Sequence, residues 1–474
     1  MPQRLGTEEF SAEGIGLILV CRGKMPARNV AHWHQSRMQD NSAESPPRAA
    51  FGYPNFRFYL SARLLTTAAS EMQSVAVGWQ LYAITHRPLD LGLAGLAQFL
   101  PGICLFLFAG HIADQVQRQR ILQTCVTAFA LCSGLLLLFT FQHGTLSNAT
   151  YRPYPLYAIL ILNGIIRAFN APANSAFLPS LVPRAVFLNA VAWNSSAFQT
   201  ATIVGPMIGG LLYGFTGSPV YVYICAASCY LTALLLISRL KLAPWERPKT
   251  GISIGVVLDG LKYIGANKLV LGAISLDLFA VLLGGAVALL PVYAHGILNV
   301  GATGLGLMRS APGVGAVLTS ILLAHYPLRR KAGVTMLWCV FAFGLFTVAF
   351  GLSRSLLLSL PMLFLIGASD TVSVVVRSTM IQMSTPDEVR GRVSAVTMVF
   401  VGASNEVGQF ESGLTAQWFG PVPAVVLGGV GTMLIVGAWA WLFPALRRMD
   451  LIGAQPSPAS VIKGQKEAAI KEAG

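Results

Sequence analysis

Charged and amide side chains recur at helical spacing inside segments that are otherwise apolar. Residues 57–84 carry polar or small residues at i, i+4, i+8, i+11 and i+15, namely Arg63, Thr67, Glu71, Ser74 and Gly78. At about 100° per residue these positions fall within about 80° of one another, so they share one face of a helix. Residues 155–176 carry a second such stripe, formed by Asn163, Arg167, Asn170 and Asn174. Side chains of these types can hold a proton, an ion or a polar solute.

The second half of the chain supplies further ionisable candidates. Asp370 and Arg377 share one helical face within residues 355–377, and Asp277, Arg309, Glu406 and Glu411 lie in other apolar segments. An ionisable side chain at the centre of a bilayer costs at least about 2.5 kcal/mol, so such residues face a cavity or a partner. Each one alone could simply pair across helices to fix the packing. The whole set favours a wet path, and a carboxylate such as Glu71 or Asp277 on that path could carry a proton.

The composition excludes an ordinary soluble protein. Of the 474 residues, 54% are hydrophobic and 11% are charged, whereas a soluble domain carries about 25% charged residues. The sequence predicts an all-α integral membrane protein with twelve transmembrane helices. The predicted segments are 57–84, 91–110, 121–142, 155–176, 187–215, 218–239, 268–293, 302–324, 332–352, 355–377, 393–418 and 422–445.

The basic residues predict the orientation. If both termini are cytoplasmic, the outside loops hold only Arg87, Arg152 and Arg354, and fourteen Lys and Arg residues fall in the inside loops. Cationic loops resist translocation, so this asymmetry places both termini inside. It also accounts for much of the net charge of +14 without a nucleic-acid partner.

The second half of the chain repeats the first. Residues 183–217 run in register with residues 386–420, pairing Gly205 with Gly408 and Gly210 with Gly413 at an offset of 203. At an offset of 211, Leu100-Pro-Gly102 meets Ala311-Pro-Gly313. An even number of crossings brings the second half in on the same side, which predicts two pseudo-symmetric six-helix bundles in parallel orientation. We assign the bundles to residues 51–240 and 268–446.

The connecting and terminal segments are predicted to differ from the bundles. Residues 241–267 form a cytoplasmic linker, in which apolar residues at helical spacing predict a short helix on the membrane surface. Residues 1–50 are polar, and we interpret them as a disordered extension or as the product of a start codon assigned too early. The residues before Cys21 faintly resemble a lipoprotein cleavage site. The segment that precedes them, however, carries acidic residues where a signal peptide needs positive charge. Residues 447–474 form a cytoplasmic tail.

A short polar loop joins the second and third predicted helices. It reads Gly110-His-Ile-Ala-Asp114-Gln-Val-Gln-Arg118-Gln-Arg120 and resembles motif A of the major facilitator superfamily of transporters, although Gln117 stands where many members have Gly. Asp114 could face a helix N-terminus beside Arg390 and Arg392, where the helix dipole and the guanidinium groups favour an anion. That contact would hold the cytoplasmic side shut. The alternative is a solvated loop charge.

A second motif lies in residues 187–215. Ala201-Thr-Ile-Val-Gly205-Pro206-Met-Ile-Gly209-Gly210 resembles motif C of the proton-antiporting exporters in the same superfamily, with Ala201 in place of a leading Gly. Glycine permits close helix contact, and proline removes a backbone hydrogen bond and bends the helix. Ordinary packing of small residues is the alternative explanation for this stretch.

Longer stretches narrow the resemblance to the branch that contains siderophore exporters. Residues 72–82, 99–101, 170–179, 289–294 and 386–392 carry it, within about residues 55–447. It implies proton-driven efflux of a small molecule across the inner membrane. In the superfamily the first, fourth, seventh and tenth helices line the central cavity, and Arg63, Glu71, Arg167, Asp277, Asp370 and Arg377 fall on them. Members of the branch are also assigned to drugs, lipids and unknown solutes.

Other classes of function find less support in the residues. The sequence has no Walker-type phosphate loop, no metal-spaced His/Cys cluster and no Gly-x-Ser-x-Gly elbow. We therefore expect no enzyme and no cofactor, a proton gradient as the energy source, and a functional monomer whose partners are a small-molecule substrate, protons and the lipid bilayer. A lipid-modifying membrane enzyme, an importer and a non-transporting sensor stay as alternatives.

Overall fold

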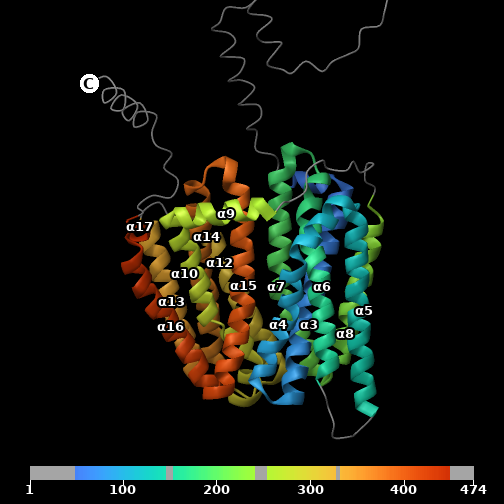
Figure 1. Ribbon diagram of the computed structural model, residues 1–474. Helices are drawn as coiled ribbons and strands as arrows, with labels where there is room; N and C mark the ends of the chain where they lie inside the picture. Colours follow the sequence, from blue (N-terminus) through green and yellow to red (C-terminus); the bar gives the residue numbers. More distant parts are fainter. Residues whose placement is uncertain (1–47, 146–152, 241–253, 327–330, 449–474) are drawn as a thin grey trace, which may run out of the picture.

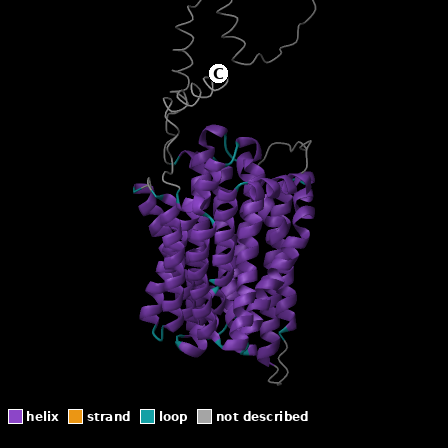
Figure 2. Cartoon of the chain, turned by 60° about the vertical axis from the view of Figure 1, so that its left-hand side comes forward, coloured by secondary structure: helices purple, strands orange, loops and turns teal. Residues whose placement is uncertain are grey.

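The computed structural model describes residues 48–145, 153–240, 254–326 and 331–448, and within these ranges the regular structure is helical, with no strand. Long helices run side by side through the whole depth of the molecule (Figures 1 and 2). The predicted segments 1–50 and 447–474 lie outside the described residues except at their inner ends. There Ala50 is fully buried, and its backbone N–H donates to Asn189 Oδ1 at 3.1 Å.

The first half contributes six long helices. A 3-10 turn precedes them, and several helices begin with proline, whose fixed φ suits the first helical turn. The elements are η1 (Ala49–Gly52), α3 (Pro54–Thr85), α4 (Pro88–Gln115), α5 (Arg118–Thr145), α6 (Tyr154–Phe177), η2 (Leu178–Ser180), η3 (Arg184–Val186), α7 (Phe187–Thr216) and α8 (Val220–Ser238).

The second half repeats this series after a short connecting helix. Its first long helix is interrupted at Gly284 and Gly285 and continues through short 3-10, α and π turns around Pro291. The elements are α9 (Ile254–Ala266), α10 (Lys268–Leu283), η4 (Ala286–Leu289), α11 (Leu290–Val292), η5 (Tyr293–Ile297), α12 (Gly301–His325), α13 (Ala332–Leu352), α14 (Leu356–Ser384), α15 (Asp387–Phe419), α16 (Pro421–Leu442) and α17 (Pro444–Arg447).

Nine segments of the described chain are long and apolar enough to cross a membrane, counting Lys268–Ile297 as one. The long helices α3, α7 and α15 are not among them. They have enough length, with 32, 30 and 33 residues, but polar side chains interrupt their apolar stretches. The all-α membrane architecture is confirmed, and the count of twelve spans stays a prediction.

The two halves pack by the same plan. In the first half α3 packs on α7 and α8, α4 on α6, and α5 on α6 and α8. In the second half α10 packs on α15 and α16, α12 on α14, and α13 on α14 and α16. The halves meet through two equivalent pairs, α7 with α12 and α4 with α15. The helices follow one another in the same order in both halves, so the internal repeat of the sequence is also a repeat of packing.

Glycines let these two pairs approach closely on one side of the molecule. A Cβ atom at Gly210 of α7 would lie 2.5 Å from the Cα of Gly306 of α12. A Cβ atom at Gly413 of α15 would lie 3.0 Å from the Cα of Gly92 of α4. In Figure 1, α9 lies across the upper end of the bundle. Both glycine contacts lie toward the opposite end of the long helices. We call these sides the α9 face and the far face, and we infer that the glycine contacts seal the far face.

A short helix, α9 (Ile254–Ala266), lies within the predicted linker. It lies across the ends of the long helices and packs on α15 (Figure 1). Ile264 is buried beside Val393 and Val396, and the hydroxyl of Tyr263 donates to the carbonyl of Ser384 at 2.7 Å. The helix is therefore anchored to the second half. The rest of the predicted linker, residues 241–253, lies outside the described residues.

Opening of the far face should be favoured by a side chain placed in one of these glycine contacts. We expect Gly210→Val to force α7 and α12 apart, because its Cβ would meet backbone atoms of Gly306. Backbone atoms cannot move aside by a change of rotamer. The measurement is the rate at which a membrane-impermeant thiol reagent, added from the far face, labels a cysteine placed at Gly78. This rate should be higher in the Gly210→Val variant than in the chain that keeps Gly210.

The matched control is Gly134→Val in α5, where an added Cβ meets no atom within 4 Å. Equal labelling rates in the Gly210 and Gly134 variants would contradict the assignment of the glycine contact as a seal.

Candidate functional site

A cavity of about 570 Å³ lies between the two halves. Most of its wall comes from α3, α4, α6, α12 and α15, so both halves contribute. Its polar and ionisable lining residues are Ser70, Glu71, Gln73, Ser74, Gln98, Asn163, Arg167, Arg309, Asn405, Glu406 and Gln409, and aromatic rings of Phe129, Phe198 and Tyr230 complete it. Charges of both signs therefore face one space at the seam.

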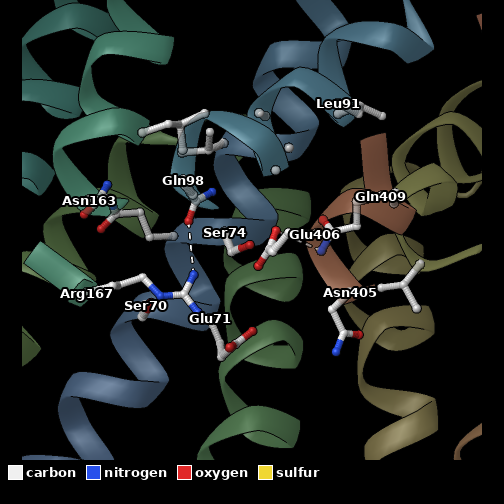
Figure 3. Close-up of a pocket in the computed structure, with 18 of the residues that line it drawn as sticks. Ser70, Glu71, Ser74, Leu91, Gln98, Asn163, Arg167, Asn405, Glu406 and Gln409 are labelled. Atoms are coloured by element: carbon white, nitrogen blue, oxygen red, sulfur yellow. Dashed lines mark hydrogen bonds between the residues drawn. The ribbon is translucent and has the colours of Figure 1, made fainter. Parts of the chain in front are cut away.

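The first half presents Arg167 and Glu71 to this cavity. Arg167 Nη1 donates to Gln98 Oε1 at 3.3 Å, which joins α6 to α4 (Figure 3). Gly164 lies one turn before Arg167, and a Cβ there would meet the carbonyl oxygen of Gln98 at 2.2 Å. The glycine thus lets α6 approach α4 closely enough for the arginine to reach the amide. Because that partner is neutral, the bond orients the guanidinium group without neutralising it.

The second half presents Arg309 and Glu406. Arg309 Nη2 donates to Ser74 Oγ at 2.8 Å and so joins α12 to α3 across the seam. Gln409 Nε2 donates to Glu406 Oε2 at 3.2 Å. Figure 3 shows Glu406 and Gln409 on the side of the cavity facing Ser74 and Gln98. Glu406 lies close enough to Arg167 and Arg309 for electrostatic attraction to both. Among the described residues neither arginine forms a salt bridge within 4 Å.

A second cavity of about 280 Å³ adjoins the first and shares Glu71, Arg167 and Phe198 with it. Arg63, Asn170 and Asn174 line this space, which extends toward the ends of α3 and α6 at the α9 face. The Cζ atom of Arg63 lies 5.8 Å from the ring centroid of Phe198, a distance suited to a cation–π contact. Asn174 is anchored through Nδ2 to Asn170 Oδ1 at 2.9 Å. The two cavities together form a polar path from mid-depth toward the α9 face.

Three predicted residues form a separate cluster in the second half. Arg377 of α14 makes a salt bridge with Asp277 of α10, and both side chains are buried. Asp370, two helical turns before Arg377, interacts electrostatically with both. None of the three lines either of the cavities described above. The structure thus brings Arg63, Glu71, Arg167, Asn170, Arg309 and Glu406 together, and it sets Asp277, Asp370 and Arg377 apart from them.

The remaining predicted residues lie at the periphery. Glu411 accepts a hydrogen bond from Thr415 Oγ1 at 2.7 Å on its own helix and does not line the cavity. Near the α9 face, Arg118 Nη1 donates to the carbonyl of Ala176 at 2.7 Å, and Arg120 is exposed. Arg390 Nη2 donates to the carbonyl of Thr385 at 3.3 Å. The side chain of Asp114 lies outside the described residues, so the predicted contact with Arg390 and Arg392 stays a prediction.

The motif around Gly205 and Pro206 packs α7 on α3 and α12. A Cβ at Gly205 would lie 2.8 Å from the Cβ of Glu71, and one at Gly209 would lie 2.9 Å from the Cα of Met72. The adjacent Gly210 forms the seam contact with Gly306 described above. The glycines of this stretch therefore set the distance of α7 from the helix that carries Glu71, and also from the opposite half.

Several lining residues were missed by the sequence analysis. Gln98, Asn405 and Gln409 are neutral amides, and a single amide in an apolar segment gives a weak signal beside a charge. Gln98 stands three residues before Pro101 in α4. Its polar side chain in an otherwise apolar segment was the only sequence signal that could have marked it as a lining residue. Gln98 accepts a hydrogen bond from Arg167, and Gln409 donates one to Glu406, so these two amides orient charges that the sequence did identify. Asn405 instead donates to the carbonyl of Val401 on its own helix.

Comparison with known proteins identifies the family. The family model described as "Transmembrane secretion effector" matches residues 45–471, which is nearly the whole chain. The chain belongs to this family. The family is of the major facilitator type, so the protein is a multi-pass membrane transporter and not an enzyme. In the described part of the chain no group of three or more His, Cys, Asp or Glu side chains could hold a metal ion.

Relatives and solved structures agree with this membership. The chain is 27% identical over 399 residues to the enterobactin exporter EntS of Shigella boydii serotype 4 (strain Sb227), covering 81% of the chain and 90% of that protein. EntS of Escherichia coli O9:H4 (strain HS) gives the same values. This transmembrane secretion effector is thus related to exporters.

Many solved structures share the fold, and the two described next do so at low sequence identity. A POT family transporter in complex with 5-aminolevulinic acid has a TM-score of 0.67 at 10% identity, over 84% of this chain and 97% of that one. A bacterial homolog of the human lysosomal transporter Spinster, in an inward-facing and unoccupied conformation, has a TM-score of 0.63 at 15% identity, over 84% and 99%. The likeness establishes the architecture of two facing bundles.

The buried pair Asp277–Arg377 gives a test of stability. Arg377→Met should leave the Asp277 carboxylate without its counter-charge and cost about 3–5 kcal/mol. The double variant Asp277→Asn with Arg377→Met should recover most of that loss, because an amide tolerates the site without a cation. The measurement is the free energy of unfolding in detergent, from a denaturant titration. Equal losses for the single and the double variant would contradict a pairwise interaction.

Proposed function

We propose that this transporter exports a small organic solute across the inner membrane in exchange for protons, by alternating access of one central cavity to the two faces. The observation that carries the proposal is the cavity at the seam. It holds guanidinium and carboxylate groups from both halves, its arginines are oriented by neutral partners, and glycine contacts join the halves on its far-face side. Rocking of the halves about the seam would expose the same charges to the other side.

The orientation follows from the charges at the two faces. Arg120, Arg239, Lys262, Lys268 and Lys331 lie at helix ends on the α9 face, and Arg87 and Arg354 lie on the far face. Because cationic loops stay in the cytoplasm, we assign the α9 face and both termini to the cytoplasm. The structure then corresponds to an inward-facing carrier. In the outward-facing state, a contact of Asp114 with Arg390 and Arg392 would close the cytoplasmic side.

Glu71 and Glu406 are the acids best placed to couple protons to this motion. Both line the central cavity, one from each half, and both lie among arginines of the cavity wall. Such a carboxylate meets outside water in one state and inside water in the other. It can therefore bind a proton from the outside and release it to the inside. Asp277, which is buried, and Asp370, which is partly buried, form a second group whose proton occupancy would respond to movement of α10 against α14.

The cavity chemistry suits a solute that bears acidic and aromatic groups. Arg63, Arg167 and Arg309 can donate to oxyanions, and Phe129, Phe198 and Tyr230 can stack on rings. The related protein EntS is named an enterobactin exporter. We extend to this chain the general class of siderophore-like solutes. The monomer suffices for this function, because one chain supplies both halves of the cavity.

The direct test uses cells with and without the gene, grown under iron limitation. We expect one metabolite to accumulate inside the deletion strain and to disappear from its supernatant, and the purified metabolite to enter proteoliposomes only when a pH gradient is imposed. Transport that ignores the pH gradient would contradict proton exchange, and unchanged metabolite profiles would contradict export of this class of solute.

The coupling acids give a sharper prediction. Glu71→Gln and Glu406→Gln should each lower proton-driven transport by at least about tenfold, a change of about 1.4 kcal/mol in the barrier, since an amide cannot exchange a proton. The measurement is solute transport with parallel recording of internal pH.

The matched control is Asp90→Asn, an acid-to-amide change at a buried carboxylate that accepts a hydrogen bond from Tyr157 and does not line the cavity. It should retain transport. Full activity of both glutamine variants would remove Glu71 and Glu406 from the mechanism.

A further inference from the structure

A third cavity lies on the opposite side of α12 from the polar path. It measures about 490 Å³ and is lined by two residues of α7, four of α12 and three of α14. They are Ile203, Met207, Leu307, Ser310, Ala311, Val314, Leu360, Pro361 and Phe364. The cavity shares no residue with the central one, although Arg309, which faces the central cavity, is adjacent to Ser310 in sequence. We call this space the lateral groove.

The lateral groove offers no free hydrogen-bonding side chain. Its one polar residue, Ser310, is buried, and its hydroxyl group is engaged with the carbonyl oxygens of Ile203 at 2.7 Å and Gly306 at 2.9 Å. The other lining side chains are aliphatic, aromatic or thioether groups. A polar solute would lose its hydration here without replacement, so the groove selects a purely apolar occupant.

The position of the groove determines which apolar occupant is available. Its α12 residues, 307–314, lie in the middle of Gly301–His325, which is long and apolar enough to span a membrane, as is α14. The outer rim is open, because Val314 is 38% exposed, and Leu318, two turns beyond Ala311, is 53% exposed. A groove open at this depth in a membrane protein faces hydrocarbon about 30 Å thick. The molecules that reach it are the acyl chains of membrane lipids.

The groove also belongs to the seam between the halves. Ile203 of α7 packs against Gly313 of α12, where an added Cβ would lie 2.6 Å from the Ile203 side chain. The Gly210–Gly306 contact that seals the far face lies one to two turns away. An occupant of the groove therefore touches α7 from the first half and α12 and α14 from the second half at the same time.

We propose that the lateral groove binds one acyl chain of a membrane phospholipid, and that this chain bridges the two halves while the far face is sealed. The chain fills space that the side chains leave empty, which recovers dispersion contacts on both halves. Opening of the far face separates α7 from α12 and removes one wall of the groove. The bound lipid thus favours the sealed state, which makes the lipid a ligand of the conformational equilibrium as well as the solvent of the protein.

The experiment uses the full chain in vesicles of phosphatidylethanolamine and phosphatidylglycerol that contain a trace of phosphatidylcholine with a photoreactive diazirine in its acyl chain. After illumination, the labelled peptides are mapped by mass spectrometry. We expect labelling at Met207, Leu307 and Phe364 to exceed severalfold the labelling at Leu231 and Leu235 of α8, which are 53% and 66% exposed and line none of the three cavities described here.

Variants on one helix separate the groove from the general lipid surface. Ala311→Phe fills the groove and should lower labelling at Met207 and Phe364 severalfold, whereas Leu318→Phe, on the exposed surface of α12, should leave it unchanged. Labelling spread evenly over exposed helices, or equal in both variants, would overturn the proposal. So would a dimer on size exclusion that Ala311→Phe abolishes, because the occupant would then be a second copy of the chain.

The distribution of labelled residues in the wild-type chain tests the proposal even if Ala311→Phe fails to fold. It also separates this inference from the proposed function, because the lipid vesicles contain no transported solute. Loss of transport with normal groove labelling would contradict the function alone.

Discussion

The constraint on which this structure depends is the cost of holding charges within a hydrocarbon layer. Arg167, Arg309, Glu71 and Glu406 lie on long helices of a membrane protein, and the arginines have neutral partners. Such groups are tolerated at that depth only beside water or a counter-charge. The chain meets this demand by dividing into two bundles whose facing surfaces enclose a polar cavity. The division into halves and the transport site are therefore consequences of one requirement.

The same two bundles must also touch firmly enough to close one face. Glycine makes this possible, because it lets α7 reach α12 and α15 reach α4 with backbone contacts that a side chain would prevent. Closely packed interfaces of this kind have discrete arrangements, since small displacements lose contacts rather than stretch them. The sealed far face is one arrangement. Alternating access requires a second one, in which the seal forms at the α9 face.

Much of the fold could be predicted from the sequence, because membrane helices are read from apolar length and the repeat from matched glycines. The segments 57–84 and 187–215 correspond closely to α3 and α7, and Gly205 and Gly408 occupy equivalent contacts against α3 and α10. The polar stripe of α3 also lies at the two polar cavities, since Glu71, Ser74 and Gly78 line the central one and Arg63 and Thr67 line the adjoining one. The periodicity of one helix was enough to group those residues.

Helical periodicity shows which residues share one face of a helix, but it could not show which other helix packs on that face. Asp277, Asp370 and Arg377 have the same pattern as Arg167, yet they meet one another between α10 and α14 instead of lining the central cavity. Gln98 and Gln409 carried no charge to mark them, and their roles depend on the approach of other helices. The predicted segment 268–293 is interrupted at Gly284 and Gly285, a break that was not predicted because the turns that follow it depend on packing.

The most direct measurement of the central claim is a pair of distances between the halves, one at each face. Spin labels at Arg87 and Trp418 would report the far face, and labels at Arg239 and Arg447 the α9 face, in a chain without native cysteines. The account predicts that acidification and solute change the two distances in opposite directions, one growing as the other shrinks. Two distances that stay fixed, or that grow together, would contradict alternating access about a central seam.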